Sequence, residues 1–171
     1  NSQNTALVVE VVDSSALVAP FYVIALKDKA VNVLSLNKPS SGAEDAKYTR
    51  GLVEITRTNF VINNDYIINS VNGRVADIKR QSPNERIQGE FLMYSRDKTT
   101  LVFLTKSALY QVNYRTGETE TLTVPAALLA NPEVIRNEIA ANYSWGTNKN
   151  GTPFLKYNGD PVRIVYIKEF Q

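Results

Sequence analysis

The sequence predicts a mainly β protein, either an antiparallel β-sandwich or a barrel-like meander, with one short helical segment near residues 126–143. Three observations lead to this prediction. Short runs rich in β-branched and aromatic residues recur between turn signals, as they do in sandwiches and barrels. The dipeptide Asn72-Gly73, which favours tight hairpin turns, separates two of these runs. Good helix formers gather in a single stretch after Pro125.

The first half of the chain is expected to form at least four strands. The run Thr5–Val12 reads TALVVEVV and is apolar at both sets of alternate positions apart from Glu10, so we expect it to be buried on both faces. Two more strands are expected over Val18–Leu26 and Val31–Leu36. The alternation over Gly51–Ile62 predicts one half-buried strand.

Three hairpins are expected to follow as a meander of consecutive antiparallel strands. In the first, Asn72-Gly73 is expected to be a two-residue turn with φ > 0 at both positions. The three expected strand pairs are Tyr66–Val71 with Arg74–Ile78, Glu90–Tyr94 with Thr100–Thr105, and Leu109–Tyr114 with Thr119–Val124.

Two of these hairpins are similar in sequence. The strings IINSVNGRVADI and LYQVNYRTGETETL both place a glycine-containing turn between two strands, a weak likeness to a β-propeller blade. A propeller needs about four or more blades of roughly forty residues each, so this chain is too short to close one. We therefore interpret the similarity as shared hairpin composition.

One amphipathic helix is expected near the C-terminal end. Asn131 and Pro132 read as an N-cap and a first helical residue, and the helix is expected to span Pro132–Ala141. Val134, Ile135 and Ile139 fall at helical spacing and predict one apolar stripe, which would cover a sheet. A last strand is expected over Pro161–Phe170.

Composition indicates a single folded domain over residues 1–171. The chain is 43% hydrophobic and 21% charged, which is typical of a globular protein with its own core. The formal net charge is only +2, and the Lys and Arg residues are scattered, so a nucleic-acid partner is not expected. No apolar run approaches the ~20 residues that a membrane-spanning helix needs.

The chain contains no histidine and no cysteine. Nucleophilic triads that use imidazole or thiolate groups, and zinc sites built from the same groups, are therefore excluded. The acidic residues form no recognisable catalytic pair, so we expect no enzymatic activity, no catalytic residues, no cofactor and no metal. Calcium would need only oxygen ligands, but the oxygen-rich segments Asn63–Asp65 and Tyr157–Asp160 have the composition of ordinary turns.

The setting of the protein is expected to be extracellular. The chain begins at Asn1 and its only methionine is Met93, a pattern that indicates removal of a leader peptide. We therefore expect a secreted or cell-surface protein, with a virion as another setting. Two sequons make Asn142 and Asn150 candidate N-glycosylation sites.

The function expected from these features is that of a non-enzymatic structural subunit of a filament, pilus-like or virion-type assembly. Such a homo-oligomer would form by β-strand pairing or donor-strand exchange, and the polar residues Asn1–Asn4 would touch another subunit. The strand over residues 5–12 is either exchanged with a neighbour or central in its own sandwich. The expected assembly residues are Leu7, Val8, Val9, Val11 and Val12. The alternative is a monomeric barrel or sandwich that binds a small apolar ligand or a glycan.

Overall fold

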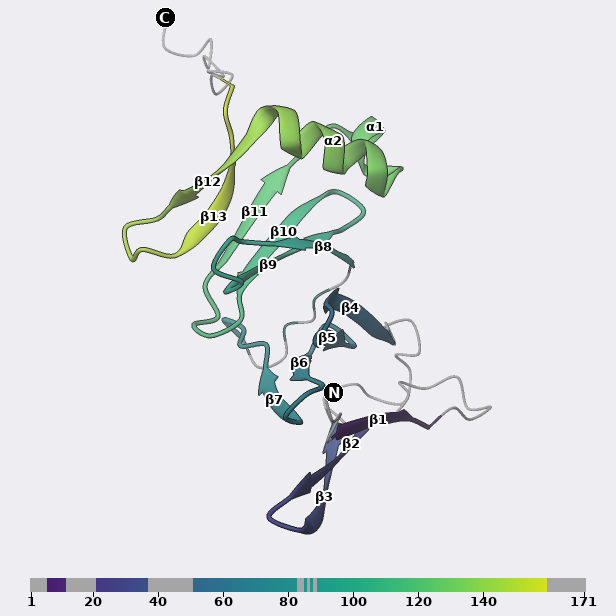
Figure 1. Ribbon diagram of the computed structural model, residues 1–171. Helices are drawn as coiled ribbons and strands as arrows, with labels where there is room; N and C mark the ends of the chain where they lie inside the picture. Colours follow the sequence, from purple (N-terminus) through teal and green to yellow (C-terminus); the bar gives the residue numbers. More distant parts are fainter. Residues whose placement is uncertain are drawn as a thin grey trace, which may run out of the picture.

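The computed structural model describes residues 6–11, 21–36, 51–82, 85, 87 and 89–159. These residues form four antiparallel sheets and two short helices, which confirms the predicted fold class. The sheets lie one above the other, face to face, from the N-terminal sheet to the C-terminal hairpin (Figure 1). The expected strand over 161–170, the segment Asn1–Asn4 and Val12 lie outside the described residues.

In every sheet the strands are neighbours in the order in which the chain supplies them. Sheet A consists of β1 (Ala6–Glu10), β2 (Phe21–Lys27) and β3 (Ala30–Leu36). Sheet B consists of β4 (Leu52–Thr56), β5 (Asn59–Ile62), β6 (Tyr66–Asn69) and β7 (Arg74–Asp77). Sheet C consists of β8 (Glu90–Tyr94), β9 (Thr100–Leu104), β10 (Ala108–Asn113) and β11 (Thr119–Thr123). Two helices, α1 (Ala126–Leu129) and α2 (Pro132–Asn142), then lead to hairpin D, formed by β12 (Tyr143–Thr147) and β13 (Pro153–Tyr157).

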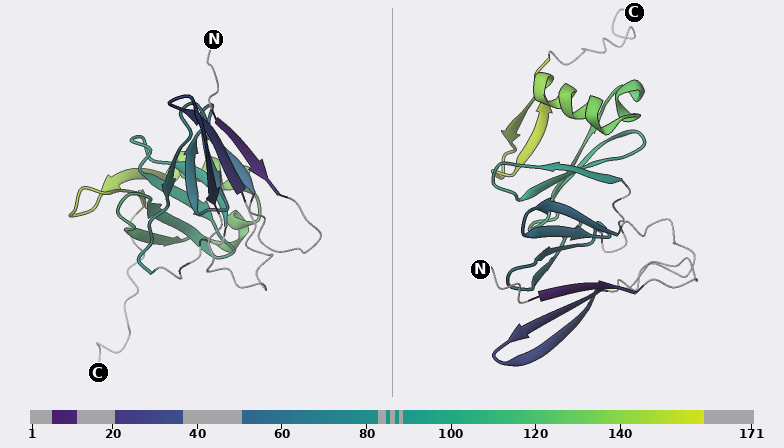
Figure 2. Two further views of the ribbon diagram at one scale, coloured as in Figure 1. Left: turned by 90° about the horizontal axis from the view of Figure 1, so that it is seen from below. Right: turned by 45° about the vertical axis from the view of Figure 1, so that its right-hand side comes forward.

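Sheet B lies between sheets A and C and contributes to a core on each side (Figure 2). Side chains alternate across a strand, so the neighbours Val61 and Ile62 of β5 point in opposite directions. Ile62 packs in the cluster that contains Phe21 of sheet A, and Val61 packs in the cluster that contains Phe103 of sheet C. Val61 and Ile62 are both fully buried. A strand that is buried on both faces carries apolar residues at consecutive positions, as β5 does here.

The second face of sheet C is covered by α2 and hairpin D. Leu109 of β10 packs in one cluster with Ile135 and Ile139 of α2 and Leu155 of β13. The N-terminus of α2 is capped as predicted, because the Asn131 side chain accepts a hydrogen bond of 2.9 Å from the backbone N–H of Glu133.

A buried polar side chain fixes hairpin D on sheet C. Gln111 of β10 is fully buried, and its amide bonds both polar groups of the Leu155 backbone. Its Nε2 donates to the Leu155 carbonyl at 3.0 Å, and its Oε1 accepts from the Leu155 N–H at 2.7 Å. The Gln111 amide therefore bonds β13 as a neighbouring strand would, and leaves none of these groups unsatisfied.

Two predictions from the sequence pattern were wrong in detail. Residues 51–62 form two strands rather than one, because the chain turns at Arg57 and Thr58. The hydroxyl oxygen of Thr56 accepts hydrogen bonds from the backbone N–H groups of Thr58 and Asn59, which stabilises this turn. The apolar stripe of α2 is also narrower than expected, since Val134 is exposed while Ile135 and Ile139 are buried.

The predicted hairpin at Asn72-Gly73 exists, but its turn differs from the expectation. Strands β6 and β7 pair from Asn69 with Arg74, so the loop holds four residues, and only Gly73 has a left-handed φ, at 65°. The Gly73 N–H donates to the Asn69 carbonyl at 2.8 Å. The Asn69 side chain accepts from the N–H groups of Val71 and Asn72, which fixes the longer loop in place of a two-residue turn.

The same loop recurs one sheet later. The Gly117 N–H donates to the Asn113 carbonyl at 2.8 Å, and the Asn113 side chain accepts from the N–H groups of Arg115 and Thr116. Both loops join the third and fourth strands of a four-stranded sheet. The sequence similarity between these hairpins therefore corresponds to one shared loop structure, which the same Asn and Gly positions form in sheets B and C.

A matched pair of glycine substitutions tests the contact between sheets A and B. Gly73 and Gly151 both have left-handed φ, but an added Cβ at Gly73 would lie 2.8 Å from the Ala25 Cβ, whereas Gly151 has open space. We expect Gly151→Ala to cost the left-handed strain of about 1–2 kcal/mol. Gly73→Ala should cost about 1–3 kcal/mol more, because the side chain would force sheet A away. Urea unfolding of both variants measures the difference, and equal costs would contradict the packing.

Candidate functional site

An open apolar surface lies on sheet A, on the face that points away from sheet B. We call it the outer face of sheet A and define it by Leu7, Val9, Val11, Tyr22, Ile24, Leu26, Val31 and Val33. The strand register places Leu7 beside Ile24 and Ile24 beside Val33, so these side chains form a row across all three strands. Leu7, Val31 and Val33 are 65%, 67% and 62% exposed.

This surface explains where the predicted assembly residues lie. Leu7, Val9 and Val11 belong to the outer face, whereas Val8 packs against the cluster between sheets A and B. Within the chain, the strand is therefore not buried on both faces as expected. The physical reason is its position: among the described strands β1 pairs only with β2, in a sheet to which the described residues add a neighbouring layer on one side.

Sequence reasoning missed the part of this surface that β2 and β3 provide. Tyr22, Ile24 and Leu26 alternate with the inward-facing Phe21 and Val23, so β2 is apolar on both faces. An apolar run of this kind does not reveal which of its faces has a partner within the chain. The strand register is needed to show that these residues join Leu7 in one surface.

The opposite end of the stack has a different surface. There α2 covers sheet C with Ile135 and Ile139 and exposes the charged residues Glu133 and Arg136. The Arg136 guanidinium also donates a hydrogen bond of 3.2 Å to the Leu92 carbonyl of β8. An amphipathic helix of this kind ends a layered core with a polar surface. The two ends of the described stack are thus unequal, since one has a polar cover and the other an open apolar sheet.

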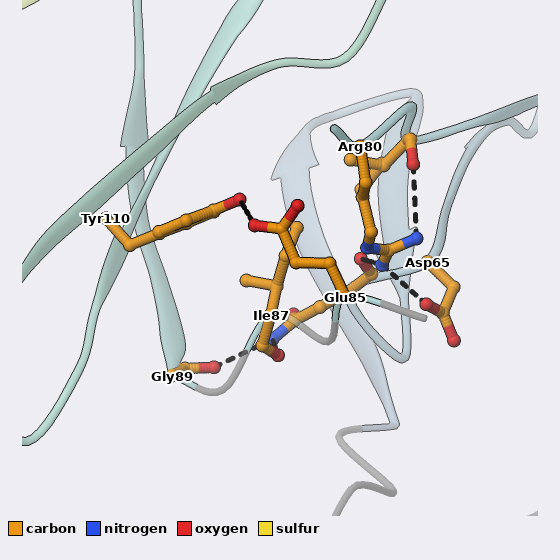
Figure 3. A network of polar contacts seen from close by, with 8 residues as sticks. Asp65, Arg80, Glu85, Ile87, Gly89 and Tyr110 are labelled. Carbon is orange, nitrogen blue, oxygen red and sulfur yellow. Dashed lines mark hydrogen bonds and ion pairs between the residues drawn. The ribbon is translucent and has the colours of Figure 1, made fainter. Parts of the chain in front are cut away.

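A network of polar groups links sheet B to the segment that leads into sheet C (Figure 3). The Arg80 guanidinium, whose side chain is only 3% exposed, pairs with the Asp65 carboxylate at 2.5 Å and donates to the Asn64 carbonyl at 2.7 Å. The Asn64 amide donates in turn to the carbonyls of Gly89 and Ile87, at 2.8 and 3.1 Å. The groups of the oxygen-rich segment Asn63–Asp65 are thus used in contacts within the protein.

A second part of the same network holds the connecting segment against sheet C. The Tyr110 hydroxyl of β10 donates a hydrogen bond to the Glu85 carboxylate (Figure 3). Burial and this hydrogen bond both raise the pKa of Tyr110, so the phenol stays protonated and remains a donor. Asp65, Arg80, Glu85 and Tyr110 each have a partner within the chain, although the buried Nε of Arg80 makes no hydrogen bond, and the network holds backbone segments in place.

A small cleft of about 230 Å³ lies between sheets B and C, at the turns that join their strands. Tyr94 and Tyr114 line it, with the Lys98 ammonium 5.9 Å from the Tyr94 ring centre and the Arg115 guanidinium 5.4 Å from that of Tyr114. Asp97 is also in its wall. Burial raises the pKa of this carboxyl, but hydrogen bonds from Ser95 and Thr99 outweigh that effect and lower it, so the group is ionised at neutral pH.

Both candidate glycosylation residues lie on the surface. Asn142 is the last residue of α2 and donates to the Glu138 carboxylate at 2.8 Å. Asn150 lies in the turn between β12 and β13, where its amide and the Thr152 hydroxyl both donate to Glu118. Hydrogen bonds from Thr152 and Asn150 lower the pKa of Glu118.

Within the described part of the chain, no group of three or more His, Cys, Asp or Glu residues is placed to hold a metal ion. None of the helices described there is long and apolar enough to cross a membrane. No protein-family model, curated protein or solved structure matches this chain.

The buried phenol of Tyr66 is expected to make the stability of the protein depend on pH in the alkaline range. Burial, together with the nearby Asp65 and Asp77 carboxylates, raises the pKa of Tyr66 to about 12 in the folded chain, against 10.0 for the free side chain. The contribution of the protonated phenol to stability is therefore complete below pH about 10 and is lost as the pH rises toward 12.

We expect the free energy of unfolding to fall between pH about 10 and 12, and to fall less steeply in Tyr66→Phe. Urea unfolding over this range measures both slopes, with Tyr157→Phe as the control because Tyr157 is exposed. Equal slopes for Tyr66→Phe and the wild-type chain would contradict the assignment.

Proposed function

We propose that this chain is a non-enzymatic structural subunit that associates with itself. The observation that carries the proposal is the outer face of sheet A, an apolar surface that spans three strands. Contiguous apolar patches of this extent are uncommon on soluble monomers and mark interaction sites. Removing an exposed Leu or Val side chain from water is worth roughly 1.5–3 kcal/mol. Burial of the exposed aliphatic members of this face therefore favours association; these are Leu7, Val9, Val11, Leu26, Val31 and Val33.

The unequal ends of the stack support the same proposal. Layered repeat proteins need a terminal unit with a polar outer face, because an open apolar layer would aggregate. The helix α2 supplies such a cover with Glu133 and Arg136, whereas sheet A carries Ile24 and Val33 at the equivalent place. Sheet A thus has the composition of an internal layer.

The engagement of the acidic groups supports a non-enzymatic role. Asp65 pairs with Arg80, Glu85 accepts from Tyr110, and Asp97 accepts from Ser95 and Thr99. Each carboxylate fixes a turn or a connecting segment, which is a structural use. A secreted or cell-surface filament or virion is the setting we propose, and the exposure of Asn142 and Asn150 is compatible with it.

A monomeric binding module is the second candidate. The cleft between sheets B and C offers two tyrosine rings and a charged rim, which would suit a small polar ligand such as a sugar. Its volume of about 230 Å³ is below the roughly 300–1,000 Å³ of most small-molecule sites. The described sheets are open and stacked, so they do not enclose a barrel cavity for an apolar ligand.

The mass in solution separates the two candidates. We expect sedimentation of the purified chain to show a species heavier than 19.1 kDa, whose fraction grows with concentration because apolar burial drives its formation. A single 19.1 kDa species at all concentrations would contradict self-association. The cleft would then become the favoured site.

A further inference from the structure

We infer that self-association occurs through the outer face of sheet A, which packs face to face against the same face of a second copy of the chain. This inference rests on the proposed function and deepens it, because it names the surface and the symmetry of the contact.

The outer face of sheet A resembles the sheet faces that already pack together within the chain. Sheets A and B meet through apolar side chains such as Phe21 and Ile62, and sheets B and C meet through Val61 and Phe103. Successive layers in this molecule therefore pack by apolar contact between sheet faces. The outer face of sheet A continues this series with the same residue types, so another antiparallel sheet is the occupant that fits it.

The sheet that could cover the outer face of sheet A can be identified from the faces that remain open. The partner must present an open apolar sheet face, and in the described part of the chain sheets B and C are covered on both sides. Hairpin D packs on sheet C through Leu155. The matching surface that this chain offers is thus the outer face of sheet A itself, and a surface that binds its own copy forms a two-fold symmetric dimer.

The outer face of sheet A is free of charged side chains at its centre. The outward positions of the three strands hold no charged residue, and Ser35 is the one polar residue among them besides Tyr22. The contact of two such faces therefore brings no like charges together at its centre. Charges are found at the rim, in the turn formed by Lys27, Asp28 and Lys29.

These rim charges select the orientation of the second copy. The turn carries one net positive charge, so the two turns repel if they lie at the same end of the dimer. A two-fold axis along the row of Leu7, Ile24 and Val33 separates them and makes each residue of that row face its counterpart in the second copy. Ile24, at the centre of the row, is then the best position for a probe.

Cross-linking of single cysteine variants tests this geometry. The chain has no cysteine, so Ile24→Cys introduces a unique thiol. Facing sheets lie ~10 Å apart, whereas a disulfide needs Cα atoms within ~7 Å of each other. The probe is therefore a short bismaleimide. We expect a covalent dimer from Ile24→Cys and none from Val134→Cys, whose exposed site lies on α2.

A charge variant gives an independent measurement. Val33 is exposed within the chain, so Val33→Lys should fold, which circular dichroism can verify. The variant would place two ammonium groups against each other in a dry contact, and we expect dimer affinity to fall by at least about 100-fold. Val134→Lys, the matched control, should leave the affinity unchanged.

The outcomes distinguish this inference from the proposed function. Self-association that persists in Val33→Lys, without a cross-link at Ile24→Cys, would overturn the inference and leave the structural role intact, with another surface responsible. A wild-type chain that is monomeric would overturn both. The outer face of sheet A would then be the binding site for a sheet of another polypeptide.

Discussion

The whole arrangement depends on one constraint, the burial of alternate side chains of the central strands β5, β9 and β10 in two different apolar layers. Val61 and Ile62 are neighbours in β5, yet one packs toward sheet C and the other toward sheet A. A strand of this kind is stable only with a layer on each side, because an uncovered face leaves several kcal/mol of apolar burial unrealised. At each end of the stack there is no further sheet within the described chain, so the last apolar face needs a different cover.

Polar contacts set the positions of the layers, since apolar contact alone has little directionality. The Gln111 amide bonds the Leu155 backbone at both of its groups, and the Asn64 amide of sheet B bonds the Ile87 and Gly89 carbonyls of the segment that leads into sheet C. Each arrangement is buried and would leave unsatisfied groups if a layer moved by one residue. The apolar faces therefore provide most of the free energy, and a few buried polar groups determine the register.

Local chemistry made the hairpins and the helix cap predictable, because Asn131 and the glycine turns act on their own neighbours. The features that failed depend on contacts beyond the local sequence. The alternation over 51–62 suits a long strand and a tight hairpin equally well, and the hairpin is stabilised by the Thr56 hydroxyl and by the pairing of β5 with β4 and β6. The likeness between the hairpins of sheets B and C is visible in the sequence as matched Asn and Gly residues, but the backbone hydrogen bonds are needed to show that Gly73 and Gly117 occupy equivalent loops.

The outer face of sheet A shows why the candidate site could be predicted only in part. The sequence points to Leu7, Val8, Val9, Val11 and Val12, because a strand that is apolar on both faces apart from Glu10 needs two covers. It does not show that Val8 lies in the core, nor that Ile24 and Val33 join Leu7 in one row, since both facts require the strand register. A cover for this end within the chain would resemble α2, with charged residues outward. Sheet A instead keeps aliphatic side chains on both faces, as sheet B does, and so has the composition of a layer with two apolar neighbours, of which the described residues supply one.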